Sequence, residues 1–151
     1  MGTVFANTAE VTAAAGQHLG YSDWLEIDQD RINTFADATG DHQWIHVDPE
    51  AAAEGPFGAT IAHGYLTLSL ASMFLPQVME VQGVSMGINY GVNKVRFLTP
   101  VVVGSRLRAG VELSQVDQIE GGIQAVATIT IEIEGSERPA AVIESVSRFI
   151  D

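Results

Sequence analysis

The chain has 151 residues, of which 46% are hydrophobic and 17% charged, and this size and composition exclude an intrinsically disordered protein. Nineteen acidic residues against seven basic ones give a net charge of -12, which disfavours nucleic acid as a partner. Because there is no cysteine, disulfides, thiolate metal sites and a cysteine nucleophile are excluded. We therefore expect one domain, residues 1–151, that acts as an enzyme or a binding protein.

The sequence shows no targeting or membrane segment. The first twenty residues lack a basic start followed by an apolar core, so no secretory signal is visible. The longest apolar stretch, residues 59–81, is interrupted by polar residues, glycine and proline, and it falls short of a transmembrane span. We expect a cytoplasmic protein with no membrane partner.

The first half of the chain is predicted to contain helices and loops. Residues 28–39 show the apolar spacing of an amphipathic helix, with Asp28 as its N-cap and Gly40 as its terminator. A second short helix is predicted to begin at Asp48-Pro49-Glu50, where a cap precedes proline, and to close near Gly55. The segment 41–47 between them is predicted to be a loop.

A buried helix followed by strands is predicted for the rest of the chain. Residues 60–75 are apolar on nearly all sides, which is typical of a buried helix. Alternating patterns then predict strands at 84–97, with a bulge near Asn93-Lys94, at 107–113, at 123–133 after a Gly121-Gly122 turn, and at 140–150. A further strand is expected near 24–27. This order predicts an α+β fold with an antiparallel sheet wrapped around the helix.

The segment from Asp41 to His46 is the best candidate for a catalytic site. A carboxylate and an imidazole five positions apart can converge on one water molecule, as addition or removal of water requires. Taken alone the spacing is weak evidence, because Asp41 could be an ordinary turn residue and His46 an ordinary loop residue.

His63-Gly64 precedes the predicted buried helix. The free N–H groups of a helix start can hold a developing oxyanion, and glycine lets a substrate carbonyl approach the backbone. The alternative is a glycine that serves only close packing. His42, His46 and Asp48 could in principle ligate a metal, but they lie on one loop, so we expect no metal. The sequence has no nucleophile elbow, phosphate-binding loop or dinucleotide fingerprint, and we expect no cofactor.

Four of the seven basic residues fall within fifteen positions. These residues are Lys94, Arg96, Arg106 and Arg108. They are either solvated strand residues or a cationic rim that could bind an anionic small molecule with phosphates.

Three segments together resemble the MaoC-like (R)-specific enoyl-CoA hydratases, and the likeness covers about residues 20–150. The family signature is Gly-Asp-x-Asn-Pro-x-His-x-Asp, and its counterpart here is Gly40-Asp41-His42-Gln43-Trp44-Ile45-His46-Val47-Asp48. The other two matching segments are Ile61-Ala62-His63-Gly64-Tyr65-Leu66 and residues 89–101.

The resemblance implies a hot-dog fold, in which an antiparallel sheet wraps a long helix, and a homodimer. It implies (R)-specific hydration of trans-2-enoyl-CoA in fatty acyl metabolism, with Asp41 and His46 activating the water and Gly64 N–H binding the thioester oxygen. Ser72 matches a polar active-site position of some members, and Lys94 and Arg96 are expected near the phosphates of CoA. Which of Asp41 and His46 is the base stays open.

The chain departs from the signature at one point, where Gln43-Trp44 replaces Asn-Pro. Loss of the proline could reshape the loop, and Trp44 could alter acyl access. Two other functions therefore stay open: a thioesterase on the same fold, and a non-catalytic protein that binds acyl thioesters.

Overall fold

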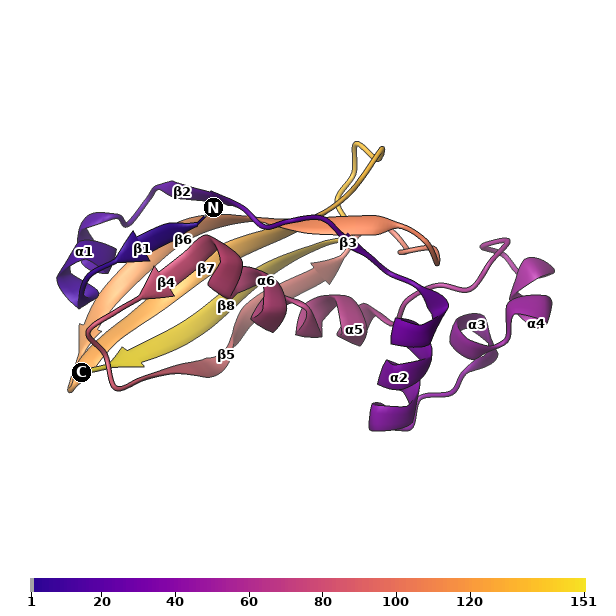
Figure 1. Cartoon of the computed structure of the whole chain (residues 1–151), viewed down its shortest axis with the longest axis horizontal. Helices are drawn as coiled ribbons and strands as arrows, with labels where there is room; N and C mark the ends of the chain where they lie inside the picture. The colour runs from indigo at the N-terminus through magenta and orange to yellow at the C-terminus, as the bar shows by residue number, and fades with distance from the viewer. Residues whose placement is uncertain (1) are drawn as a thin grey trace.

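The sheet predicted from the alternating patterns forms the body of the molecule in the computed structural model, which describes residues 2–151. Six strands pair antiparallel in the order β2-β6-β7-β8-β5, with β3 also paired to β6 (Figure 1). Inward-facing apolar residues of β6 and β7 are buried, as the period of two requires. The strands are β2 (His18–Tyr21), β3 (Leu25–Glu26), β5 (Met86–Phe97), β6 (Arg106–Ile119), β7 (Gly122–Ile133) and β8 (Ala141–Ile150).

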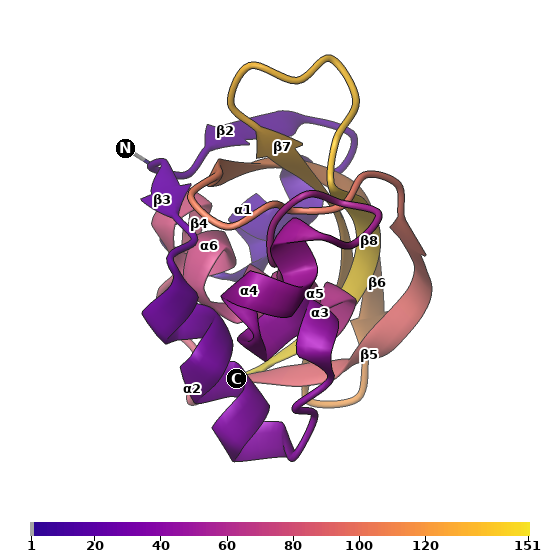
Figure 2. The ribbon, with the colours of Figure 1, turned by 90° about the vertical axis from the view of Figure 1, so that its right-hand side faces the viewer.

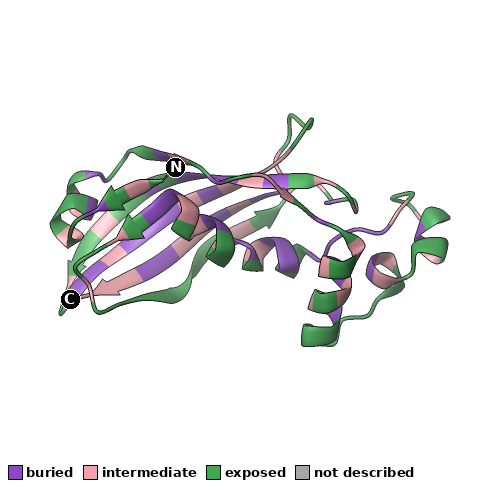
Figure 3. Ribbon diagram, viewed as in Figure 1, coloured by how far each residue is buried: buried purple, intermediate pink, exposed green. Residues whose placement is uncertain are grey.

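The predicted central helix lies against one face of this sheet and consists of two consecutive segments, α5 (Gly64–Ser69) and α6 (Ala71–Val78). Leu66, Leu70, Phe74 and Val78 are buried and belong to the same apolar core as the inward side chains of the sheet (Figure 3). Their spacing of four residues places them on one side of the helix. This is the wrapped-helix arrangement that the resemblance implies.

The helix prediction for 60–75 is wrong at both ends and in its all-round burial. Residues 60–63 are extended instead, because Ile61 forms an isolated bridge with Val102 and Ala62 N–H donates to Val101 O at 2.8 Å. The helix continues to Val78, since a proline near its end removes only one backbone hydrogen bond. Tyr65 and Met73 are 71% and 43% exposed, so one side of the helix is not covered.

Three short helices gather beyond one end of the sheet, next to the start of α5 (Figures 1 and 2). In α2 (Gln29–Thr39), Asp28 accepts a capping bond from Arg31 N–H, and Gly40 ends the helix at a left-handed φ of 80°. Asp48 caps α4 (Pro49–Ala53) through Ala51 N–H at 3.1 Å. Both predicted helices and their caps are confirmed.

The loop predicted at 41–47 is only partly correct, since Trp44–Val47 forms a short helix, α3. Its four residues are too few for a periodic pattern to show. Further elements that the sequence did not predict are β1 (Thr3–Phe5), α1 (Thr8–Ala13), β2 and β4 (Met79–Val81). All of them are also short. Among residues 2–151, no helix is both long enough and apolar enough to cross a membrane.

Strand β5 confirms the predicted bulge and adds a second one. Its pairing with β8 shifts register between Val92 and Lys94, and again between Asn89 and Gly91. The predicted hairpin turn is present but shifted by one residue, because Ile119 pairs with Gly122, so that Glu120 and Gly121 form the turn and Gly122 begins β7. Strand β5 is an edge strand, and its apolar residues are largely exposed in the single chain.

Candidate active site

Asp41, His46 and His63 meet beside the start of α5, although Asp41 and His63 are 22 residues apart in the sequence. Each offers one potential ligand atom, and these three atoms lie within 4.8 Å of one another. Asp41 follows the glycine that ends α2, His46 lies in α3, and His63 is the N-cap of α5. The predicted Asp–His pair is therefore brought together with a histidine for which the sequence had suggested no role.

His46 is buried and held at a defined orientation. Its Nδ1 lies 2.7 Å from the carbonyl oxygen of Ile61, which can only accept, so Nδ1 carries the proton. A second bond from Ile61 N–H to Ile45 O, at 3.0 Å, ties the same two segments together. In neutral His46 this leaves Nε2 with a free lone pair, which is the form that can accept a proton from water.

The main chain around His46 is held from α2. Gln29 Nε2 donates to the His46 carbonyl at 2.8 Å, and Thr60 Oγ1 donates to Gln29 Oε1 at 2.5 Å. A glutamine of the predicted helix 28–39 thus fixes the short helix α3 to the extended segment that precedes α5.

Asp41 is exposed, and its side-chain carboxylate and its main-chain carbonyl accept hydrogen bonds from different residues. Its side-chain Oδ1 accepts a long bond of 3.3 Å from Gln43 N–H, which forms a local turn. Its main-chain carbonyl accepts from His63 Nε2 at 3.0 Å. The carboxylate therefore keeps most of its capacity to accept hydrogen bonds from water or substrate.

His63 is the residue that sequence reasoning missed. It is only 3% exposed, and its ring stacks on that of His46 with centroids 3.9 Å apart and planes at 22°. Phe35 of α2 also packs against the His63 ring, with centroids 4.9 Å apart. The His63-Gly64 pair was the sequence signal for this residue, but it pointed only to the free backbone N–H groups of the helix start and not to the imidazole.

Gly64, the predicted oxyanion donor, is the first residue of α5 and directly follows His63. The N–H groups at a helix start have no partner within their own helix, which leaves them free for a ligand. Gly64 lines a cavity of about 300 Å³ with Thr67 and Phe97. A Cβ added at Gly64 would lie 3.2 Å from the Phe97 ring, so a side chain here would crowd the cavity.

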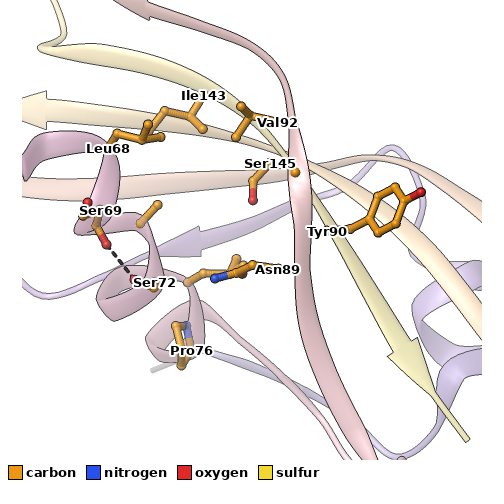
Figure 4. Close-up of a pocket in the computed structure, with 12 residues that line it drawn as sticks. Leu68, Ser69, Ser72, Pro76, Asn89, Tyr90, Val92, Ile143 and Ser145 are labelled. Atoms are coloured by element: carbon orange, nitrogen blue, oxygen red, sulfur yellow. Dashed lines mark hydrogen bonds between the residues drawn. The ribbon is translucent and has the colours of Figure 1, made fainter. Parts of the chain in front are cut away.

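Ser72 lies apart from this group, in a cavity of about 500 Å³ between the helix and β5 (Figure 4). It is eight residues beyond Gly64, or about 12 Å along a helix axis. Its hydroxyl donates to Ser69 O at 2.6 Å, while Asn89 and Ser145 line the same cavity. The structure does not join Ser72 to Asp41 and His46 through any direct contact among residues 2–151.

The basic residues of the predicted cationic rim separate into two pairs. Lys94 and Arg96 lie exposed on β5. Arg106 and Arg108 instead form ion pairs with Glu134 and Glu132 across the β6–β7 hairpin, at 2.8 and 3.1 Å. Cross-strand carboxylates therefore pair with two of the four cations, whereas Lys94 and Arg96 remain exposed.

Trp24 and Tyr21 complete the surroundings of that second pair. The Arg108 guanidinium lies 4.6 Å from the Trp24 ring and 4.2 Å from the Tyr21 ring. Arg108 is thus committed to contacts within the chain on two sides, by its carboxylate partner and by two aromatic faces.

The geometry of the three-residue group suits proton transfer to and from water. The potential ligand atoms of Asp41 and His46 lie within 4.8 Å of one another, a separation that one water molecule can bridge. Of the residues considered for a metal from the sequence, His42 Nε2 lies 2.9 Å from Asp37 Oδ1 and Asp48 caps α4. The residues therefore fit an acid–base site.

The replacement of Asn-Pro by Gln43-Trp44 leaves the local fold helical. Trp44 occupies the first position of α3. Proline is favoured at this position because an N–H there has no partner within the helix, but the helix does not require proline. The Trp44 ring packs on Gly55, since a Cβ added there would lie 2.9 Å from the ring. Trp44 lines neither of the two cavities described above, so the expectation that it alters acyl access finds no support.

An antiparallel sheet wrapped around a helix places this chain among hot-dog proteins, and a carboxylate and an imidazole lie beside the start of that helix. The MaoC-like domain model matches residues 10–135. The chain is 54% identical, over 97% of both proteins, to 3-hydroxyacyl-thioester dehydratase Z of Mycobacterium tuberculosis. It is 51% identical to Nodulation protein N of Rhizobium leguminosarum bv. viciae, over 87% of this chain and 84% of that protein.

A solved structure agrees with this assignment. The (R)-hydratase from A. caviae involved in PHA biosynthesis superposes with a TM-score of 0.72, at 27% identity, over 88% of this chain and 94% of the other. The chain belongs to the MaoC-like dehydratase family and has its hot-dog fold. This membership supports a hydro-lyase activity.

Proposed function

We propose that the protein catalyses reversible, (R)-specific hydration of trans-2-enoyl-CoA to (R)-3-hydroxyacyl-CoA, using Asp41 and His46. The observation that supports this most strongly is the fixed tautomer of His46. Its Nδ1–H is bonded to Ile61 O, so Nε2 is left as an acceptor in the neutral ring, and Asp41 belongs to the same three-residue group. The names of the mycobacterial dehydratase and the A. caviae (R)-hydratase support the same reaction class.

In this mechanism Asp41 and His46 hold one water by accepting its two hydrogens. The water oxygen forms a bond to C3 as the proton it loses passes to the pair, and the C2–C3 π electrons move toward the thioester carbonyl. A proton from the pair then bonds to C2, which gives the 3-hydroxyacyl thioester with no net change in the enzyme. We assign the first proton acceptance to His46 Nε2, because Nε2 keeps a lone pair in the neutral ring while Nδ1–H is bonded to Ile61 O.

Gly64 N–H would donate to the thioester oxygen as negative charge develops there, a contribution of roughly 3 to 4 kcal/mol for one well-placed donor. The cavity between the helix and β5, of about 500 Å³, would take the acyl chain, and Ser72 would line that chain rather than touch the reacting atoms. Lys94 and Arg96 would contact the phosphates of CoA, since both are exposed cations.

We further propose that the active form is a homodimer joined along β5. Four apolar side chains on this edge strand, Met86, Ile88, Tyr90 and Val92, are between 43% and 58% exposed in the single chain. An edge strand with an apolar surface is a template for pairing with another chain, and a second copy would cover it.

The direct test is the loss of enoyl-thioester ultraviolet absorbance with crotonyl-CoA and longer enoyl-CoAs, with free thiol measured in parallel. We expect absorbance loss without thiol release, and chiral chromatography should find the (R)-3-hydroxyacyl product. An (S) product would contradict the stereochemistry. Thiol release would indicate the thioesterase, and tight binding without any turnover would indicate the non-catalytic binder.

A further inference from the structure

The side chain of His63 contacts both members of the proposed catalytic pair. Its Nε2 bonds to the main chain of Asp41, and its ring face lies on His46. We propose that His63 is a positioning residue for the reaction, which holds Asp41 and His46 in the geometry that lets both reach one water. This inference rests on the proposed function and assigns His63 no contact with substrate.

The contact with Asp41 controls where an exposed carboxylate sits. Asp41 follows the end of α2 and belongs to no helix or strand, so its main chain depends on local bonds. The buried His63 donates to the Asp41 carbonyl at 3.0 Å, which fixes the residue against the start of α5. The Gln43 N–H bond to Asp41 Oδ1, at 3.3 Å, is too long to do this alone.

The contact with His46 controls the plane of its imidazole. The bond from Nδ1 to Ile61 O holds one edge of the ring but permits rotation about that bond. The face of His63, stacked at 3.9 Å and 22°, removes this freedom. Phe35 also packs on the His63 ring, with centroids 4.9 Å apart, and restricts its movement, so Nε2 of His46 has a defined direction.

The hydrogen bonds also assign the tautomer of His63. The Asp41 carbonyl can only accept, so the His63 proton is on Nε2, and Nδ1 is buried without a hydrogen-bond partner among residues 2–151. The two stacked histidines thus hold opposite tautomers, with the proton on Nδ1 in His46 and on Nε2 in His63.

Two variants separate the two contacts. His63→Gln keeps an amide donor for Asp41 O and removes the ring, whereas His63→Phe keeps the ring and removes the donor. His18→Phe is the matched control, because His18 lies on β2 and packs against Tyr21. We expect both His63 variants to lower kcat about 10- to 100-fold with KM changed less than about twofold, since the lost interaction orients the reacting groups. His18→Phe should match the wild type.

If His63 only stabilises the fold, kcat of the folded fraction should be unchanged in both His63 variants. This outcome would overturn the inference. Nitrogen-15 NMR of uniformly labelled protein supplies a readout independent of turnover. We expect opposite tautomers for His46 and His63 in the wild type. We also expect His63→Phe to move the Gln43 amide resonance, because that N–H bonds to Asp41.

The two proposals can fail separately. If the wild type turns over no enoyl thioester, the proposed function fails, and the NMR readout alone decides the role of His63. Identical tautomers, or an unmoved Gln43 resonance in His63→Phe, would overturn the positioning role even in an active hydratase.

Discussion

At the scale of single residues, the site depends on backbone carbonyls that assign protons to histidines. Ile61 O and Asp41 O each accept from one ring nitrogen, and this leaves the other nitrogen of each ring with a lone pair while the ring is neutral. The same scale explains Gly64, where the Phe97 ring leaves little room for a side chain. Small geometric changes at these positions should therefore cost activity more than stability.

Gly64→Ala tests this expectation. The added methyl group would meet the Phe97 ring at 3.2 Å and occupy space beside the proposed oxyanion donor. We expect kcat/KM for enoyl-CoA hydration to fall about 10- to 100-fold, as small misplacements at reacting centres do. In the double variant with Phe97→Leu the contact with the ring is relieved. We expect the rate not to recover, because the methyl group would still obstruct the substrate. Wild-type activity in Gly64→Ala would rule out close substrate approach at this position.

Residue types and spacing predicted Asp41, His46 and Gly64 as site residues, but they could not predict that the His63 side chain contacts Asp41 and His46. Its stacking on His46 depends on how α2, α3 and α5 pack, and that packing joins segments 17 to 28 residues apart. Likewise the residue counts could not show that Arg106 and Arg108 are paired, because their partners lie across a hairpin. Local patterns report local structure, whereas these contacts arise from tertiary structure.

At the scale of elements, the three short helices present the site, and their caps define where each one starts. Caps and terminators were readable from the sequence because their physics is local: Asp28, Gly40 and Asp48 act where they were predicted. Helix α3 and the two ends of the central helix were not readable. There, tertiary contacts such as the Ile61–Val102 bridge override the apolar pattern.

Asp28→Ala tests the role of a cap in holding α2, which supplies Phe35 and Gln29 to the site. The lost bond to Arg31 N–H, 2.8 Å long, should lower the free energy of unfolding by about 1 kcal/mol. For a chain of this size this corresponds to a fall in Tm of roughly 2 to 4 °C, measurable by calorimetry. Asp28→Asn keeps the acceptor and should stay near the wild type. Equal losses in both variants would show that charge, rather than capping, is responsible.

At the scale of the whole molecule, the proposed dimer would cover the exposed apolar surface of β5. Ile88→Lys would place a charge in the proposed interface and should convert a dimer into a monomer, as read by sedimentation velocity. Val4→Lys is a suitable control, because Val4 is 54% exposed on β1, away from β5. A dimer that survives Ile88→Lys unchanged would place the interface elsewhere.

The central claim is that Asp41 and His46 act together on one water. The most direct measurement is kcat/KM for crotonyl-CoA hydration in Asp41→Asn, His46→Gln and the double variant, with Asp37→Asn as the control on the neighbouring helix. We expect each single variant to lose about 10³-fold or more and the double variant to be little worse, because groups that work as a unit are not additive. Losses that multiply, or either single variant within about tenfold of the wild type, would contradict the account.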